Sequence, residues 1–119
     1  MTHEELIEVF EKIQKDAVET LKIKNRAYAS NGDALANYKE ASRFLGCSKY
    51  ETWGNYFFKH VSSIFKAIRD NPESPVDMSE GLRSRIIDAI TYLGMLEAML
   101  VEDATITIFV PGSSKDMKK

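Results

Sequence analysis

The sequence predicts an all-α fold, and three observations support this prediction. Apolar residues recur at three- and four-residue steps over long stretches, which is the spacing that places side chains on one face of a helix. Glycine, asparagine and proline interrupt these stretches where turns are expected. The chain has 119 residues, of which 44% are hydrophobic and 29% charged, as in a single soluble globular domain. We therefore expect one helical domain with four helices over residues 1–103.

The first helix is expected to run from about residue 3 to the high 20s. Thr2 and Glu5 have the spacing of a capping box, a pattern that marks helix N-termini. The pair Asn31-Gly32 marks a turn after the helix. One buried face is predicted from the apolar spacing of Leu6, Phe10, Ile13, Ala17 and Leu21.

The second and third helices are expected over residues 33–45 and 49–69. Gly46 is a natural C-terminal stop for the second helix. The third helix should end before the segment 70–75, which contains two prolines. Its apolar face is predicted to carry Trp53, Phe57, Val61, Ile64 and Ile68.

The fourth helix is expected to begin near Ser79, a plausible N-cap. After Asp103 the residues become β-branched and aromatic, which predicts a short strand or extended arm over residues 104–112. The polar tail 113–119 is expected to be flexible. The predicted apolar face of the fourth helix carries Leu82, Ile86, Ala89, Ile90, Leu93, Leu96 and Leu100.

Composition and charge exclude several functional classes. The chain has 16 basic and 18 acidic side chains and a net charge of −2, so strong nucleic-acid binding is not expected. No apolar run approaches the roughly 18–20 residues that span a bilayer, and the acidic N-terminus differs from a signal peptide, so no membrane association is expected. The single cysteine cannot form an internal disulfide, which fits a cytoplasmic location.

A first polar cluster closes the first helix and continues into the next segment. Lys24 or Arg26 could contact a phosphate while Tyr28 stacks on a base, because lysine offers a mobile positive charge and an aromatic ring offers a stacking face. Asp33 and the pair Asn37-Tyr38 follow. Alternatively, the basic residues only complement the dipole at the C-terminus of the helix.

A second cluster, Lys59-His60, lies inside the third helix beside apolar residues. His60 could donate a hydrogen bond to phosphate or act as a general base, which makes it the candidate catalytic residue. The alternative is a hydrogen-bonded structural histidine at the edge of the core.

A third cluster lies in the fourth helix. Asp88 and Tyr92 are four residues apart and share a face, whereas Glu80 lies about 12 Å from Asp88 along the axis. The two carboxylates therefore cannot chelate one Mg²⁺ ion from a straight helix, although each could bind an ion with ligands from elsewhere. Alternatively, Arg85 and Asp88 form an intrahelical ion pair and Glu80 is favoured by the helix dipole.

Together these clusters resemble a known family. The matching stretches are KNRAYASNGDALANYKEASRFLG, then KHVSSI, then SEGLRSRIIDAITYLGML, which occur in order between Lys24 and Leu100. They are similar to the phage and bacterial family called nucleotide modification associated domain 1, within the all-α, MazG-like nucleoside triphosphate pyrophosphohydrolases.

The resemblance implies a four-helix MazG-like bundle, usually completed by oligomerisation with a second copy. It also implies a nucleotide and Mg²⁺ site between helices, where water attacks a phosphoanhydride. Metal ligation would fall to Glu80 and Asp88. His60 is added to the residues that the resemblance implies because its imidazole can donate a hydrogen bond to phosphate. The candidate nucleotide-binding residues are then Lys24, Asn25, Tyr28, Asn37, Lys59, His60 and Tyr92.

Two departures from the family pattern reduce the acidic character of the expected metal site. Ala27 and Ser84 stand where the family has aspartates, and Asp33 is a candidate partial substitute. A depleted acidic site keeps a second hypothesis open. In that hypothesis the chain is a non-catalytic, phage-type effector that sequesters a nucleotide or binds and inhibits a host protein.

Overall fold

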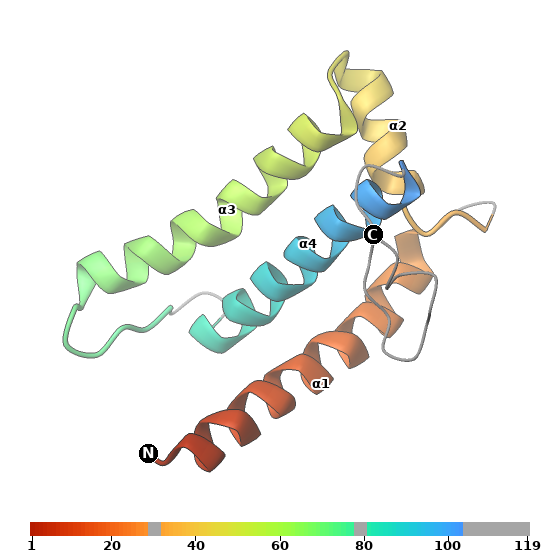
Figure 1. Ribbon diagram of the computed structural model, residues 1–119. Helices are drawn as coiled ribbons and strands as arrows, with labels where there is room; N and C mark the ends of the chain where they lie inside the picture. The colour runs from red at the N-terminus through yellow and green to blue at the C-terminus, as the bar shows by residue number, and fades with distance from the viewer. Residues whose placement is uncertain (29–31, 78–80, 104–119) are drawn as a thin grey trace.

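The computed structural model describes residues 1–28, 32–77 and 81–103, with side chains described outside residues 25–28. It contains four helices, which are α1 (His3–Tyr28), α2 (Ala36–Leu45), α3 (Lys49–Asp70) and α4 (Leu82–Glu102) (Figure 1). No β-strand occurs within these ranges. The predicted all-α class is confirmed, while the predicted arm 104–112 and tail 113–119 lie outside the described residues.

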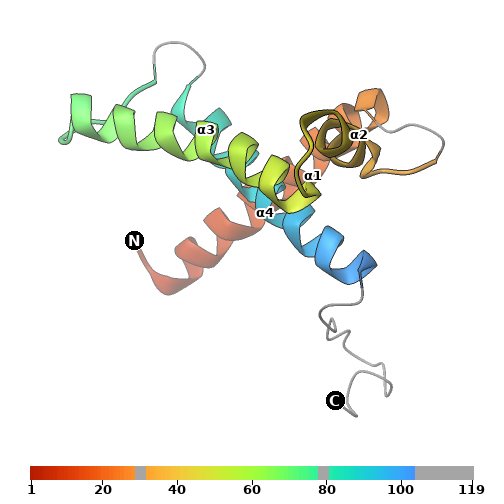
Figure 2. The same ribbon diagram turned by 90° about the horizontal axis from the view of Figure 1, so that it is seen from above.

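The central helix is α4, which packs against α3 on one side and α1 on the other (Figure 1). The short helix α2 packs against α3 beside the C-terminal end of α4. Seen from above, the long helices cross one another at an angle and spread apart (Figure 2). One end of the molecule is therefore closed by α2, and the opposite end is open.

Local sequence signals account for several helix ends. Thr2 and Glu5 form the predicted capping box, in which the Glu5 backbone N–H donates to Thr2 Oγ1 over 3.1 Å. Gly46 ends α2 in the left-handed conformation with φ of 71°, which glycine adopts without a steric penalty. The N-cap of α4 is Gly81 rather than the expected Ser79, which lies outside the described residues, and the helix begins at Leu82.

The hydrophobic core is small and lies at the closed end. Its buried centre consists of Leu35, Tyr38 and Met99, which come from the start of α2 and the end of α4. Half-buried residues of α3 and α4 pack around this centre: Tyr50, Trp53, Tyr56, Tyr92, Met95 and Leu96. The aromatic side chains of α3 thus pack against both the start of α2 and the C-terminal part of α4.

The prediction that the apolar face of α1 is one buried stripe is wrong for its N-terminal half. Ala17 is buried, but Leu6 and Phe10 remain 43% and 55% exposed. The physical reason is the crossing of the helices, since α1 and α4 touch near the middle of α1 and diverge toward its N-terminus (Figures 1 and 2).

The predicted apolar face of α4 is covered only in part, since Leu96 packs against the core while other members of the face are exposed. The buried residues of α4 are Asp88 and Met99, whereas Ile86 and Leu93 are 40% and 51% exposed. The helix is most deeply buried on the side that carries Asp88 and Met99, so Ile86 and Leu93 are left outward.

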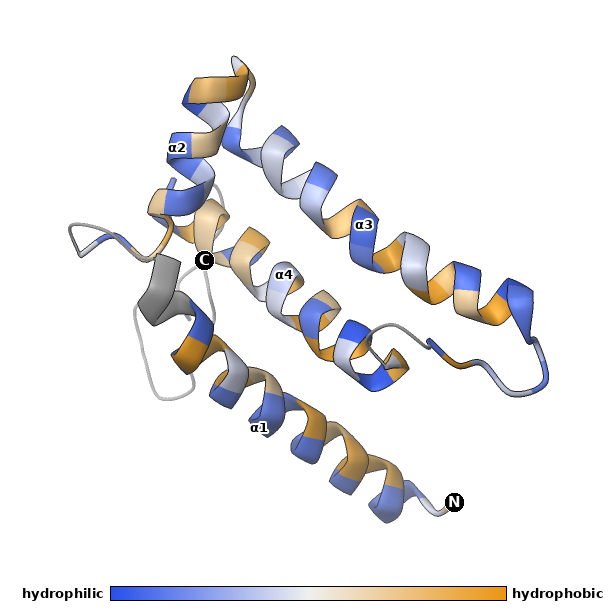
Figure 3. Ribbon diagram, turned by 180° about the vertical axis from the view of Figure 1, so that it is seen from behind, coloured by the Kyte–Doolittle hydropathy of each residue, from blue (hydrophilic) through white to orange (hydrophobic). Residues whose placement is uncertain are grey.

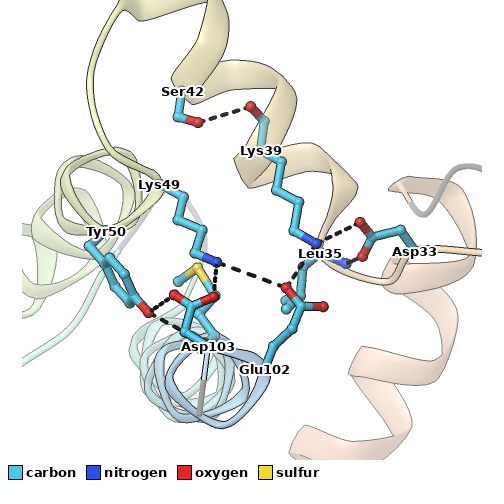
Figure 4. A network of polar contacts seen from close by, with 9 residues as sticks. Asp33, Leu35, Lys39, Ser42, Lys49, Tyr50, Glu102 and Asp103 are labelled. Atoms are coloured by element: carbon cyan, nitrogen blue, oxygen red, sulfur yellow. Dashed lines mark hydrogen bonds and ion pairs between the residues drawn. The ribbon is translucent and has the colours of Figure 1, made fainter. Parts of the chain in front are cut away.

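A network of polar contacts joins the helix ends at the closed end of the molecule (Figure 4). Lys39 of α2 forms ion pairs of 2.8 Å with both Asp33 and Glu102. Lys49 of α3 lies 2.7 Å from Asp103, which also accepts a hydrogen bond from the Tyr50 hydroxyl. These contacts fix the end of α4 against α2 and the start of α3.

None of the helices in the described ranges is long and apolar enough to cross a membrane.

Candidate functional site

A cavity of about 390 Å³ opens between the four helices, next to the small core. This volume lies in the range of pockets that hold small organic ligands. Each helix contributes to its wall, as does the segment before α2. The lining residues are Leu21, Lys24, Ala34, Asn37, Tyr38, His60, Asp88, Thr91, Tyr92 and Met95.

Asp88 is the central charged group of the cavity. It is 6% exposed, and its Oδ1 accepts a hydrogen bond from Lys24 Nζ over 3.0 Å. The two residues are 64 positions apart in the chain, so the contact depends on the packing of α1 against α4. A buried carboxylate needs such compensation, because removing an unpaired charge from water is costly.

The Lys24 side chain is 54% exposed, in contrast to its partner. A flexible lysine that reaches into the cavity from solvent can turn from the carboxylate to a ligand without breaking a packed core. Lys24 therefore supplies a movable positive charge at the cavity mouth.

His60 approaches Asp88 from α3. Its Nδ1 lies 3.6 Å from Asp88 Oδ2, which is too long for a hydrogen bond. This nitrogen is buried and has no hydrogen-bond partner among the described residues. A small rotation of the ring would bring Nδ1–H onto the carboxylate, and a paired histidine of this kind is oriented for proton transfer at its other nitrogen.

Tyrosines form one wall of the cavity. The ring of Tyr92 lies 4.9 Å from the His60 ring and 6.5 Å from the Tyr38 ring, and Tyr56 packs on the other side of Tyr38 at 5.9 Å. Burial raises the pKa of Tyr38 above its usual value, and the neighbouring tyrosines Tyr92 and Tyr56 raise it further. Tyr38 therefore stays protonated, so this wall is uncharged and apolar apart from its hydroxyl groups.

The backbone of α4 is held at this wall by α3. Trp53 Nε1–H donates to the Tyr92 carbonyl oxygen over 2.6 Å, and its ring stacks on Phe57 at 4.9 Å. This contact places Tyr92 and, one turn earlier, Asp88 relative to His60.

The structure brings together most of the predicted nucleotide-binding residues that it describes. Lys24, Asn37, His60 and Tyr92 all line the cavity, and so does the predicted metal ligand Asp88. These residues come from different helices, as the ordering of the sequence motifs predicted.

Other predicted site residues lie elsewhere or are not described. Lys59 is exposed and does not line the cavity. Asp33 is engaged by Lys39, and its Oδ1 accepts from the Leu35 backbone N–H over 2.9 Å, so its side chain stabilises the turn before α2. The side chains of Asn25 and Tyr28, and the whole of Glu80, lie outside the described residues.

Sequence reasoning missed part of the cavity wall. Thr91 and Met95 follow Asp88 by three and seven residues on α4, so helical periodicity alone places them on the same face. Leu21 precedes Lys24 by three residues on α1 in the same way. Helical periodicity around the predicted polar residues was therefore the sequence signal that could have identified these wall residues.

Metal ligation from the described residues is limited to few donors. Within residues 1–28, 32–77 and 81–103, no group of three histidine, cysteine or acidic side chains is close enough to hold a metal ion. Asp88 is the carboxylate that lines the cavity. Arg85 was the alternative partner expected for Asp88. Its Nε instead donates a hydrogen bond to Asp77 over 2.9 Å.

Comparisons with models of protein families, with curated proteins and with solved structures found no match to the chain.

Proposed function

We propose that the cavity binds a nucleotide together with Mg²⁺, and that the protein is a MazG-like nucleoside triphosphate pyrophosphohydrolase. One observation carries this proposal. Lys24, His60 and Asp88 come from three different helices and converge on one cavity that also has a tyrosine wall. A mobile cation can bind phosphate, and a histidine can accept a proton from water. A carboxylate can bind a metal ion, and aromatic rings can stack on a base.

The charges in the cavity favour a nucleotide that carries a metal over a bare one. Asp88 would repel phosphate, and Lys24 already neutralises it over 3.0 Å. Magnesium is commonly held by one or two carboxylates together with substrate phosphates and waters, so Asp88 fits the role of the protein ligand. Lys24 is then released to bind a phosphate oxygen.

His60 is suited to accept the proton of the attacking water. In the proposed reaction, the water oxygen bonds to the α-phosphorus, the bond to the bridging oxygen breaks, and pyrophosphate leaves. When bound, Mg²⁺ would neutralise phosphate charge during this step. Asp88 Oδ2 lies 3.6 Å from His60 Nδ1, so it would orient the ring once the ring turns its Nδ1–H onto the carboxylate.

Tyr92, Tyr38 and Asn37 would hold the nucleoside part. The tyrosine rings provide apolar surface, and the amide of Asn37 offers both donors and an acceptor to a base edge. We further propose that the protein acts as a homo-oligomer, as the family resemblance implies, and that it is cytoplasmic, in keeping with its single cysteine.

Calorimetric titration with nucleoside triphosphates, with and without Mg²⁺, tests the binding site. Asp88→Asn should weaken Mg²⁺-dependent binding by about 100-fold, which is the effect of losing one charged ligand. Asp16→Asn is the matched control, because Asp16 is also ion-paired, at 2.7 Å from Arg83, but does not line the cavity. Unchanged affinity in Asp88→Asn, or equal losses in both variants, would contradict the proposed site.

Release of pyrophosphate tests the reaction. His60→Gln should lower kcat by about 100-fold or more while leaving nucleotide affinity within a few-fold, because a general base contributes to the transition state. Binding without turnover in the unmodified protein would overturn the hydrolase and leave a nucleotide-sequestering protein. Absence of binding to any nucleotide would overturn the proposal in favour of an effector that binds a host protein.

A further inference from the structure

An open, mostly apolar groove runs between α1 and α4. Its wide part, of about 930 Å³, lies toward the open end of the molecule, and a narrow part of about 410 Å³ continues toward the closed end. Gln14 and Ile90 line both parts, so the two form one groove. Hydrophobic segments recur along both helices (Figure 3). The apolar walls include Val9, Phe10 and Val18 of α1 and Ile86, Ile90 and Met95 of α4.

The described residues leave the walls of this groove uncovered. Val9, Phe10 and Val18 are each about half exposed, and Ile86 is 40% exposed. The groove stays open because α1 and α4 diverge toward the N-terminus of α1 (Figure 2). Contiguous exposed apolar surface of this kind commonly marks a contact with another segment.

The chain itself carries an apolar segment that begins where the groove reaches the closed end. Beyond Asp103 the sequence continues with residues 104–110, which lie outside the described residues. In an extended chain, successive side chains point to opposite sides. One side of an extended segment would therefore carry Ile106, Ile108 and Val110, and the other Thr105, Thr107 and Phe109. The first set has the apolar character of the groove walls.

The length of this segment matches the groove. The axis of α4 measures about 26 Å from Asp103 back to Ile86, because each helical residue advances about 1.5 Å. An extended chain advances about 3.3 Å per residue, so residues 104–110 span about 23 Å. A segment that runs back along α4 therefore passes the narrow part of the groove and reaches the wide part.

Charge complementarity supports the same direction. Residues 3–11 of α1 contain four glutamates and no lysine or arginine, and two of these glutamates, Glu5 and Glu8, line the wide part of the groove. Residues 113–119 contain three lysines and one aspartate. The first of these lysines, Lys115, lies up to about 40 Å from Asp103 in an extended chain, which is enough to reach the glutamates. Opposite charges thus meet at the open end when the segment follows the groove.

We propose that residues 104–110 bind in the groove between α1 and α4, antiparallel to α4, with Lys115 against the glutamates of α1. Ile106, Ile108 and Val110 contact the apolar walls. The groove is open along its length, so the outer side of the segment keeps its backbone polar groups in water. The bound segment joins the two helices where they diverge.

The groove also borders the candidate nucleotide cavity. Leu21, Thr91 and Met95 line both, so the bound segment packs on the outer side of the cavity wall. The inference does not rest on the proposed function, because the groove and the segment are defined without the nucleotide. Its tests use the full chain in the absence of nucleotide.

Cross-linking tests the position of the segment. In a Cys47→Ser background, a short bismaleimide should join the pair Ile86→Cys and Val110→Cys within one chain. The matched control pair is Phe65→Cys and Val110→Cys, since Ile86 and Phe65 both lie about 25 Å from the closed end along their helices. Binding in the groove raises the effective concentration of the first pair, which should be joined about tenfold faster than the control pair or more.

Two results of this experiment would overturn the proposal. Equal rates for the two pairs would show that the segment has no preference for the groove. A joined product with twice the chain mass of 13.5 kDa would show that the segment is exchanged between two copies instead. Circular dichroism of each variant confirms that the helices are retained.

Two neighbouring substitutions test which side of the segment faces the groove. Ile108→Asp should slow the joining of positions 86 and 110 by about tenfold or more, because it places a carboxylate against apolar walls. Thr107→Asp is the matched control, since it adds the same charge on the opposite side and should change the rate by less than about twofold. Equal slowing by both variants would overturn the proposed alternation, and no slowing by either would remove the segment from the groove.

Charge reversal tests the far end of the segment. Lys115→Glu should slow the same joining reaction about two- to fivefold, which is the range expected for exposed ion pairs. Glu8→Lys in the same chain should restore the rate, because it restores the attraction with the signs exchanged. A second reversal that leaves the rate unchanged or slows it further would contradict the placement of Lys115 at the open end.

Discussion

The two sides of α4 have opposite relations between polarity and burial. The side toward the cavity buries Asp88 at 6% exposure and Met99 completely, and it is tied to α1 and α3 through ion pairs and ring contacts. The other side leaves Ile86 and Leu93 exposed although it is the more regularly apolar. The first side of α4 therefore supplies the stability and the candidate site, whereas Ile86 and Leu93 on the second side contribute little buried area.

The largest difference between the two sides should appear on truncation to alanine. Met99→Ala should lower the free energy of unfolding by about 2–5 kcal/mol, because it leaves a void between Leu35 and Tyr38. Leu93→Ala should cost less than about 1 kcal/mol within one copy, since the side chain is half-exposed.

Urea unfolding followed by Trp53 fluorescence measures both effects. The cost of Met99→Ala should be several times that of Leu93→Ala, because Met99 is completely buried and Leu93 is half-exposed. Equal costs at the two positions would remove the distinction between the two sides of α4.

The capping boxes of α1 and α3 allow a second comparison, between the open and the closed end of the molecule, with smaller expected losses of stability. Ser48 and Glu51 cap α3 at the closed end beside the polar network, and Thr2 and Glu5 cap α1 at the open end. Ser48→Ala should cost about 1 kcal/mol of unfolding free energy, a typical loss for an N-cap. Thr2→Ala should cost only a few tenths of a kcal/mol, since the first turn of α1 can fray without disturbing the core.

Hydrogen exchange at the first turns of α1 and α3 provides the matching local measurement. Protection in α1 should fall in Thr2→Ala with no change in α3. A loss of protection that spreads from α1 to the core would show that the open end is coupled to the closed end.

The smallest effect is expected in the polar network. Hydrogen bonds from Lys49 and Tyr50 lower the pKa of Asp103 below its usual value. A carboxylate with a lowered pKa stabilises the folded state above its unfolded pKa of about 3.9, and this stabilisation is lost as the pH falls through the folded pKa. Asp103→Asn should therefore be slightly less stable than the unmodified protein at pH 7, and the difference should vanish in acid.

Thermal unfolding between pH 7 and pH 2 measures this convergence. Asp70→Asn is a suitable control, because Asp70 forms an exposed ion pair with Lys66 at the other end of α3. A difference between Asp103→Asn and the unmodified protein that persists unchanged at pH 2 would show that the carboxylate charge is not its cause.

Much of the local structure was predictable because it depends on nearby residues. The capping box at Thr2 and the stop at Gly46 are contacts or conformations within a few residues, and both were predicted. The pairing of Lys24 with Asp88 spans 64 residues, so the motifs predicted that the two would share a site but could not supply their contact. Lys59 and His60 are adjacent in sequence, yet a 100° turn of the helix puts only His60 in the cavity wall.

By itself the sequence determined that this chain forms helices, where most of them end, and which polar residues a core does not explain. It could not determine which face of each helix is buried. Apolar periodicity identifies a face that seeks a partner, but the partner is chosen by the crossing of whole helices. In α4 that crossing buries Asp88, which Lys24 compensates, and leaves Leu93 outward. Only the tertiary structure decided this, because the free energy of a buried charge and of exposed apolar side chains depends on residues far away in the chain.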